Sequence, residues 1–345
     1  RDRSPSRGLG DVYKRQGDFR FNVGAIYNYN RNKLDELPNA DQYLYSSYWG
    51  SSSLVPTNDY MFVEGKAIGL VRGFISEGYY TVDDFNYTNG QYVLKEGVPD
   101  ITKALTATYM HPYDLPAGQT AFPGAAKFRD VDESGTVDLD DATCLGEVMP
   151  RHTGSFQLNF NYKNFDLSTN FNWTAGGKVY NVAAMINASG QEFDGIGAQR
   201  ASWVADAFKV YNVNAAGDLY AVTNPDELRA LNANAKYHLP YHQSGITSSE
   251  WLENGSYLRL QTLTLGYTLP KNWLAKVHVD KIRLYLTATN LFTITGYSGI
   301  DPEVNANPTG QSGFYSNLRI FPTLNMDFGT YPRARTFTFG ANITF

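Results

Sequence analysis

The 345-residue chain is predicted to be all-β, with its strands forming part of an antiparallel transmembrane β-barrel. Three observations support this class. Apolar and small polar residues alternate in segment after segment, as they do in strands with one apolar and one polar face. No run of about 18 apolar residues is present, so the sequence offers no transmembrane helix. Short and long connections alternate between the expected strands, which is the layout of bacterial outer-membrane barrels.

The segment Arg335–Phe345 shows the alternation most clearly. From Thr336 onward, one face carries Phe337, Phe339 and Phe345 with an Ala and an Ile, and the other carries only Thr, Gly and Asn. Lipid on the first face and a wet lumen behind the second explain this pattern. We expect the strand that would pair with its far edge to be missing from this chain, which leaves one edge of Arg335–Phe345 unpaired.

We expect about eight strands with this alternation. They comprise residues 18–30, 58–64, 68–80, 153–163, 165–174, 256–269, 281–291 and 333–345. Within 256–269 the apolar residues change phase near Gln261 and Thr262. A β-bulge there would restore a single apolar face, and the alternative is a strand buried on both sides.

The expected connections alternate in length. Gly65–Lys66, Lys163–Asn164 and 270–280 are short. The long connections are 31–57, 81–152, 175–255 and 292–332. If the last strand ends in the periplasm, every short turn is periplasmic and every long segment is an extracellular loop. The predicted structure is therefore an open, curved partial wall with long extracellular loops.

Composition and charge exclude several functions. The net charge of −5 argues against nucleic acid as a partner. A single cysteine, Cys144, rules out an internal disulfide framework. The sequence has no G-x-S-x-G elbow, no Walker loop and no Cys/His zinc spacing, so we do not predict an enzyme.

Residues 1–16 differ from the rest of the chain. They carry five basic and two acidic residues, a local charge of +3, and they show neither strand nor helix periodicity. We interpret them as a non-native segment derived from a sequencing adapter and leave them out of the fold prediction. The alternative is a native basic arm.

A series of motifs extends through the last third of the chain. In order they are Trp251–Leu260, Leu265–Pro270, Ala288–Thr293, Gly299–Val304, Tyr331–Arg333 and Thr336–Phe345. This series resembles the C-terminal barrel of SusC/RagA-type TonB-dependent transporters. The resemblance covers nearly all of residues 17–345 and is loosest in the long connections.

The resemblance implies a barrel of about 22 strands with an N-terminal plug, in the outer membrane of a Gram-negative, Bacteroidota-like bacterium. It implies import of large nutrients, oligosaccharides or peptides, together with a SusD-like surface lipoprotein and with TonB. Contacts with outer-membrane lipid follow, and no cofactor is required. We expect this chain to lack the plug, the TonB box and the N-terminal half of the barrel, and therefore not to transport by itself.

Two other functions remain open. The chain could be a β-rich surface module that binds glycans or mediates adhesion, or a small autonomous barrel. A soluble module would turn its apolar strand faces into a shared core. A membrane wall would turn them outward on a convex surface, with Phe21, Leu158, Phe171, Leu284 and Phe339 as markers.

The run Asp130–Asp141 has the spacing of a calcium-binding loop. Oxygen ligands occur at loop positions 1, 3, 5, 7, 9 and 12, with Gly135 at position 6 for the sharp turn. The candidate Ca²⁺ ligands are Asp130, Asp132, Ser134, the Thr136 carbonyl, Asp138 and Asp141. Position 12 is usually Glu, and no flanking helix pair is evident. The alternative is an acidic, solvated turn held by its own hydrogen bonds.

Aromatic residues suggest two further roles. Trp203, Tyr237, Tyr241 and Trp251 lie in the long connections, where exposed rings would stack on sugar substrates. The alternative is that they pack the loops together or contact a lipoprotein partner. Aromatic residues of the strands are instead expected to form girdles at the two membrane interfaces, namely Tyr27, Tyr29, Trp173, Tyr267 and Phe345.

Overall fold

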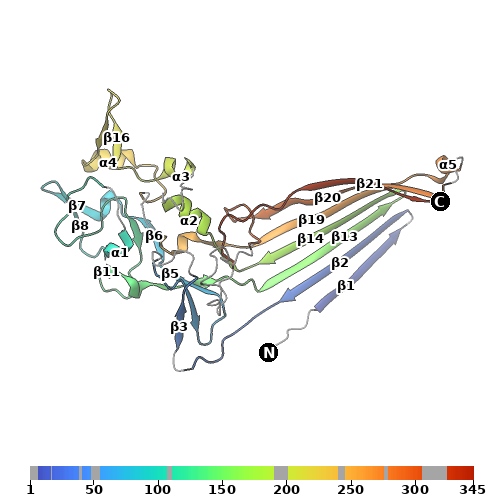
Figure 1. The fold of residues 1–345 in the computed structure, drawn as a ribbon, viewed down its shortest axis with the longest axis horizontal. Helices are drawn as coiled ribbons and strands as arrows, with labels where there is room; N and C mark the ends of the chain where they lie inside the picture. The colour runs from blue at the N-terminus through green and yellow to red at the C-terminus, as the bar shows by residue number, and fades with distance from the viewer. Residues whose placement is uncertain are drawn as a thin grey trace, which may run out of the picture.

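The computed structural model describes residues 7–16, 18–38, 41–47, 55–106, 111–189, 201–239, 245–275, 279–304 and 325–345. It consists of a long β-sheet, here called the wall, and a compact lobe at one end of it (Figure 1). The wall is an antiparallel sheet of seven strands in the order β1-β2-β13-β14-β19-β20-β21. Its strands are β1 (Arg7–Gln16), β2 (Phe19–Tyr29), β13 (His152–Tyr162), β14 (Phe165–Ala175), β19 (Tyr257–Thr268), β20 (Lys281–Thr295) and β21 (Thr336–Thr344).

The strand register gives the wall one apolar and one polar face. Residues that pair directly across neighbouring strands share a face. One apolar row consists of Val23, Leu158, Thr169, Leu263, Ala288 and Phe337. The adjacent polar row consists of Asn22, Asn159, Ser168, Thr264, Thr287 and Thr338. The five marker residues all have the phase of the apolar face, and none of them belongs to a buried core within the described residues.

The predicted β-bulge is confirmed. The pairing of β14 with β19 passes from Phe171–Leu260 to Asn170–Thr262, so that Gln261 is left out of the ladder. The pairing of β19 with β20 shows the same shift between Leu260 and Thr262. The extra residue places both halves of β19 with their leucines on the apolar face.

Two predicted wall strands lie in the lobe instead. Residues 58–64 and 68–80 form β4 (Tyr60–Val63), β5 (Leu70–Gly73) and β6 (Ser76–Tyr79), and the first two belong to a separate sheet, β12-β5-β4-β3. The prediction was wrong because these strands are short and lie in a packed core. Four residues extend only about 13 Å, too little to cross an apolar band of about 25 Å.

The wall also includes part of residues 1–16, which show no strand periodicity in sequence. Arg7–Gln16 forms β1, which pairs antiparallel with β2 along the edge of the wall. A strand ladder uses backbone groups, which any sequence without proline provides, and an open edge accepts such a partner. The interpretation of these residues as non-native stays a prediction.

The short turns and the long connections lie at opposite ends of the wall (Figure 1). The β1–β2, β13–β14 and β19–β20 connections are short, whereas 30–151, 176–256 and 296–335 are long. Two of the predicted wall strands lie in the lobe instead. Because two crossings return the chain to the same end of the wall, their removal leaves the alternation of short and long connections unchanged. The unpaired edge of the last strand is also confirmed, since β21 pairs with β20 and with no other strand among the residues that the structure describes.

The sheet is open, and its two edge strands run in the same direction. Every neighbouring pair in the wall is antiparallel, so the first and the seventh strands are parallel to each other. Direct pairing of β1 with β21 would therefore not be antiparallel. Closure of the sheet into an antiparallel barrel requires an odd number of additional strands, which argues against a small autonomous barrel.

The lobe is built from the connections 30–151 and 176–256. Its strands and helices are β3 (Gln42–Tyr45), β7 (Phe85–Thr88), β8 (Gln91–Leu94), β9 (Asp100–Ile101), β10 (Ala126–Phe128), β11 (Thr136–Val137), β12 (Thr143–Glu147), β15 (Lys178–Tyr180), β16 (Tyr211–Val213), β17 (Leu219–Ala221), β18 (Leu252–Asn254), α1 (Lys103–Thr106), α2 (Val182–Ser189), α3 (Ala201–Asp206) and α4 (Pro225–Leu231), with 3-10 turns η2 (Val82–Asp84), η3 (Leu139–Asp141) and η4 (Ser249–Trp251). Helix α5 (Lys271–Leu274) lies at the other end of the wall. No helix among the described residues has the length and hydropathy needed to cross a membrane.

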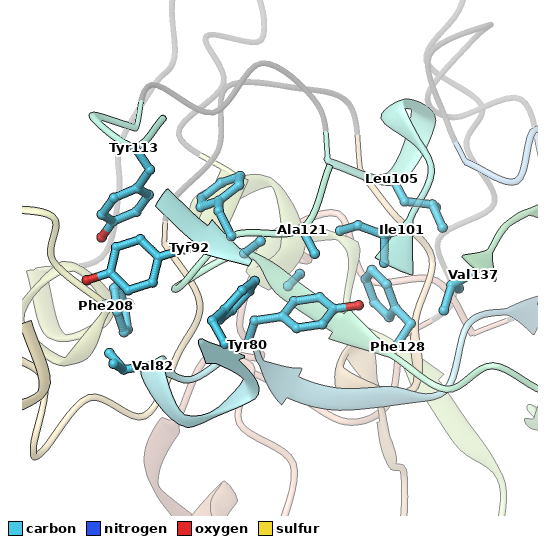
Figure 2. Close-up of a cluster of buried hydrophobic side chains, with 14 of the residues drawn as sticks. Tyr80, Val82, Tyr92, Ile101, Leu105, Tyr113, Ala121, Phe128, Val137 and Phe208 are labelled. Carbon is cyan, nitrogen blue, oxygen red and sulfur yellow. The ribbon is translucent and has the colours of Figure 1, made fainter. Parts of the chain in front are cut away.

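The lobe has a conventional buried core. Figure 2 shows its main cluster, in which Tyr80 and Ala121 are fully buried and Phe128 is nearly so. The two connections are joined by backbone hydrogen bonds. The Phe74 amide donates to the Thr247 carbonyl (2.9 Å), and the Ser249 amide donates to the Phe74 carbonyl (2.9 Å). The lobe is therefore one unit made mainly from these two distant segments, and residues 325–327 of the third connection complete it, since Met326 is fully buried there and the Asp327 amide donates to the Tyr180 carbonyl (2.9 Å).

Candidate functional site

The polar face of the wall is covered by hydrogen-bonding side chains. Ser168 Oγ donates to Asn159 Oδ1 at 2.6 Å, and the hydroxyl oxygens of Thr264 and Thr287 lie 2.9 Å apart. Arg283 forms an ion pair with Asp166 across two strands (2.5 Å). Such a surface suits contact with water or a polar solute, as in the lumen of a barrel.

The apolar face is bounded by aromatic residues at both ends. Near the short turns, Phe19, Tyr162, Phe165 and Tyr267 form one cross-strand row. Near the lobe, Tyr27 and Trp173 lie one strand apart with ring centroids separated by 6.1 Å. From Phe19 to Tyr27, β2 rises about 26 Å, which matches the roughly 25 Å apolar band of outer-membrane barrels. This geometry agrees with the expected interfacial girdles.

A glycine makes the girdle near the lobe possible. Gly154 lies between Tyr27 and Trp173 in the cross-strand row. A Cβ atom at Gly154 would approach the Ile26 carbonyl oxygen to 2.4 Å and the Trp173 ring to 2.7 Å. Because Gly154 has no side chain, the indole of Trp173 can lie over its backbone and extend toward Tyr27.

An ion-pair network joins the connection 296–335 to the polar face near the lobe. Arg259 is 2% exposed, and its guanidinium contacts Asp301 (2.5 Å) and Glu303 (2.9 Å). Arg333 contacts the other Glu303 oxygen at 2.8 Å. A cavity of about 100 Å³ lies beside it, lined in part by Tyr257 and Glu303. Sequence reasoning missed this network, although Asp301 and Glu303 both lie in a recognised motif.

The acidic loop brings three candidate calcium ligands together. The carboxylates of Asp130, Asp132 and Asp141 each offer an oxygen within 4.8 Å of the other two. Asp141 is fully buried, and it accepts hydrogen bonds from the amides of Val131 (2.5 Å) and Asp138 (2.8 Å). Its position allows a shorter carboxylate to take the place of the usual Glu at loop position 12.

The other three candidates border the same cluster. The Ser134 amide donates to Asp130 (3.1 Å) and to Asp132 (3.0 Å), and the Ser134 hydroxyl donates to the Thr136 carbonyl (3.0 Å). Hydrogen bonds from Ser134 lower the pKa of the Asp132 carboxyl. Asp138 is engaged elsewhere, because its side chain caps η3 by accepting from the Asp140 amide (2.8 Å).

The loop is anchored to the lobe by strands rather than by a helix pair. β10 precedes it, the short turn η3 forms its last three residues, and β12 follows it. Val137, at loop position 8, is fully buried and pairs with Ile101 in the parallel β9–β11 ladder. Gly135 has φ +87°, which confirms the sharp turn expected at position 6.

The predicted sugar-contacting aromatics mostly contact one another. The Trp203 and Tyr237 rings stack with centroids 3.7 Å apart, and Trp251 lies 5.3 Å from Trp203. Trp251 is only 4% exposed, so the expectation of an exposed ring is wrong there. Tyr241 lies outside the described residues. The stacking supports the alternative role, in which these rings pack the loops: all three belong to the connection 176–256, and Trp251 shares a buried cluster with Tyr45 and Tyr60 of the first connection.

Buried ionisable groups lie beside this aromatic cluster. His238 is 2% exposed, and its Nε2 lies 3.9 Å from Glu250 Oε2. Burial lowers the pKa of His238 to about 4 and raises the pKa of Glu250 to about 7. Both shifts arise because burial disfavours the charged form of each group. We therefore interpret the pair as part of the packed structure of the lobe.

Comparisons with known proteins agree with this geometry. No protein-family model matches the chain. The chain is 28% identical over 328 residues to TonB-dependent receptor P3 of Formosa agariphila, covering 95% of this chain and 27% of the relative. It is 26% identical over 246 residues to TonB-dependent receptor SusC of Bacteroides thetaiotaomicron, covering 69% and 19%. It thus spans about a quarter or less of the length of these relatives.

Solved structures show the same fold. The RagAB peptide transporter superposes with a TM-score of 0.59 at 20% identity, covering 97% of this chain and 28% of that one. The open-open state of the RagAB peptide importer gives a TM-score of 0.57. The likeness to relatives and the two-faced open sheet confirm the resemblance carried by the motifs. This chain is a relative of the SusC/RagA-type TonB-dependent receptors, and its wall has the fold of part of their β-barrel.

Proposed function

We propose that this chain forms part of the barrel wall and part of the extracellular rim of an outer-membrane importer of large nutrients. The observation that carries the proposal is the exposed apolar face of the wall. Phe339 is 73% exposed and Leu286 is 42% exposed, and both lie in one cross-strand row. A soluble module would bury this row in a core, whereas lipid covers it in a membrane.

The test is the behaviour of the full chain in detergent. Protein refolded into detergent micelles is expected to migrate faster on a gel before boiling than after it, as folded membrane β-sheet does. Far-ultraviolet circular dichroism of the same sample should report β-structure. A chain that stays monomeric and soluble in buffer alone would contradict the proposal and favour the soluble glycan-binding or adhesion module.

The partners belong to the proposal as well. We infer that the complete protein works with a SusD-like lipoprotein and draws energy from TonB, because the relatives are TonB-dependent receptors and RagAB is described as a peptide transporter. The substrate class is then an oligosaccharide or a peptide. Co-purification with a SusD-like lipoprotein encoded beside its gene tests the first partner, and failure to co-purify from detergent extracts would count against it.

Trp203 and Tyr237 are the remaining candidates for substrate contact. Both are partly buried, and their stacked rings lie next to the edge of the lobe described here. If they bind sugars, oligosaccharides should quench tryptophan emission, and Trp203→Phe should abolish the change. Quenching that persists in Trp203→Phe would remove the assignment.

We further propose that the acidic loop binds Ca²⁺ from the medium. The support is the approach of three carboxylates without a cation side chain among them, since like charges at this distance repel unless a cation or protons compensate them. Bound Ca²⁺ would neutralise the cluster and stiffen the loop against β9. Calorimetric titration of the folded chain tests this, with Asp130→Ala and Asp132→Ala as variants and Asp114→Ala, an exposed acid outside the loop, as the control. No heat of binding at millimolar Ca²⁺ would exclude the site.

A further inference from the structure

The chain leaving β2 toward the lobe carries two exposed basic residues. Residues 31–34 alternate between exposed and partly buried side chains. Asn32 and Leu34 are held by the lobe, since Asn32 Oδ1 accepts from the Ile68 amide (2.7 Å) and the Leu34 amide donates to the Lys66 carbonyl (2.8 Å). Arg31 and Lys33 alternate with them and remain exposed.

These two cations continue the phase of the apolar face. The pairing of β2 with β13 extends to Tyr29 and His152, and the Asn30 amide then donates to the Arg151 carbonyl (2.9 Å). Arg31 lies two residues beyond Tyr29, where β2 ends, so a chain that continues extended carries it to the side of Tyr27 and Tyr29. It lies just beyond the aromatic girdle, at the depth where lipid headgroups begin.

Polar atoms of Tyr27 and His152 lie at the level of this girdle. Tyr27 Oη lies 2.8 Å from His152 Nδ1, and the rings of Tyr29 and His152 have centroids 5.1 Å apart. These side chains combine apolar rings with polar atoms at one level of the wall. That combination is typical of residues that occupy a membrane interface.

The charged residues near Arg31 are paired with other groups or exposed to water. The neighbouring Arg151 is already paired with Glu147 at 2.8 Å. Lys33 Nζ lies 3.9 Å from Asp35 Oδ1, but Asp35 is 90% exposed, and such a pair is screened by water. No ion pair of Arg31 occurs among the residues that the structure describes.

From this placement we propose that Arg31 and Lys33 bind the phosphate of an anionic lipid in the outer leaflet of the membrane. The inference rests on the proposed membrane wall, because the site exists only where lipid covers the apolar face. Two cations above an aromatic belt offer charge to the phosphate and flat apolar surface to the chains below it. The site would fix the height of β2, and with it the base of the lobe, relative to the membrane surface.

The test uses the full chain folded in detergent and phosphorylated lipid A as the probe, with bound lipid counted by native mass spectrometry. The double variant Arg31→Gln/Lys33→Gln is expected to bind about 25-fold more weakly, because each cation near an anionic surface contributes a factor of roughly five. Lys163→Gln/Lys271→Gln is the matched control, since these exposed lysines lie at the opposite end of the wall. The control is expected to bind like the wild type.

Two further arms identify the ligand. Dephosphorylated lipid A should bind the wild type as weakly as phosphorylated lipid A binds the double variant, and inorganic phosphate should not displace the lipid. Equal losses in both double variants, or equal binding of the dephosphorylated lipid, would overturn the proposal. Displacement by inorganic phosphate would assign the site to a free anion instead. Failure of the chain to fold in detergent would contradict the proposed membrane wall, and this outcome is distinct from folding without lipid binding.

Discussion

The lobe and the wall use the same kinds of side chain in opposite ways. In the lobe, Phe74 and Tyr80 are fully buried within a dry core. In the wall, Phe337 and Phe339 are 64% and 73% exposed, and they share one face. Aromatic content alone does not distinguish the two settings. The strand register does, because it places most apolar side chains of the wall on one exposed face; Ile26, which pairs with Ser155 in a polar row, is an exception.

The largest expected effect separates the two regions directly. Phe74→Ala should lower the free energy of unfolding of the lobe by about 3–5 kcal/mol, because it opens a cavity in a closed core. Phe339→Ala, on the face that detergent covers, is the matched substitution and should cost less, about 1–2 kcal/mol, because it loses the transfer of the ring from water to detergent but opens no cavity. Urea unfolding in detergent, followed by near-ultraviolet circular dichroism, measures both. Equal effects would mean that the wall packs as a core.

A charge tests which face of the wall meets lipid. Leu263→Arg, near the middle of the apolar face, should lower the stability of the folded wall in lipid by about 2–4 kcal/mol. Thr264→Arg, one residue along on the polar face, should cost less because its charge remains in water. The folded fraction on unboiled gels from lipid vesicles compares the two. The assignment of faces is reversed if Thr264→Arg proves the more harmful.

Gly154 offers a smaller effect at the girdle. Gly154→Ala should cost about 1–3 kcal/mol, because its Cβ would overlap the Ile26 carbonyl and the Trp173 ring. Gly296→Ala is the control, as nothing lies within 4 Å of its Cβ position. Thermal unfolding in detergent with tryptophan emission reports the shift. A neutral Gly154→Ala would show that the ring contact is not required.

The lobe alone should respond to pH through its buried pair. Burial raises the pKa of Glu250 to about 7. The free energy of unfolding therefore falls as the pH rises from roughly 4.5 to 7, because the folded state binds more protons there than the unfolded state. Burial lowers the pKa of His238 to about 4. Its contribution to the free energy of unfolding therefore rises as the pH rises from about 4 to 6.5, because the unfolded state binds more protons there. Burial also raises the pKa of Asp59 to about 7, so Asp59 adds a fall in stability over the same range to wild type and variant alike. Relative to the wild type, Glu250→Gln should therefore make the slope of stability against pH more positive, by at most about 1.4 kcal/mol per pH unit. Urea unfolding at pH 4.5, 5.5 and 6.5 measures it, and an unchanged slope would contradict the buried pair.

The wall strands could be predicted from sequence because their pattern is local. Alternation over nine or more residues marks β21, and the change of phase at Gln261 marks the bulge. The lobe strands β4 and β5 carry similar residues but are broken by turns at Gly65 and Gly69, which have φ +78° and +86°. Their short length removes the signal that separates a lipid-facing strand from a core strand.

The candidate sites divide in the same way. The acidic loop was predictable because its ligands lie within twelve residues, and their spacing is itself the motif. The contacts of Arg259 with Asp301 and of Trp203 with Trp251 join residues more than forty positions apart. Only the folded chain brings such groups together, so sequence reasoning placed Trp251 at the surface and missed the role of Arg259.

The lobe closes only when distant parts of the chain meet. The hairpin of β13 and β14 lies between the first two connections in the sequence, and the hydrogen bonds of Phe74 with Thr247 and Ser249 join the chain across it. Met326, from the third connection, is fully buried in the same lobe. Long loops must therefore close before this core is complete, whereas the wall hairpins close locally, so the high contact order of the lobe favours its late and slow formation.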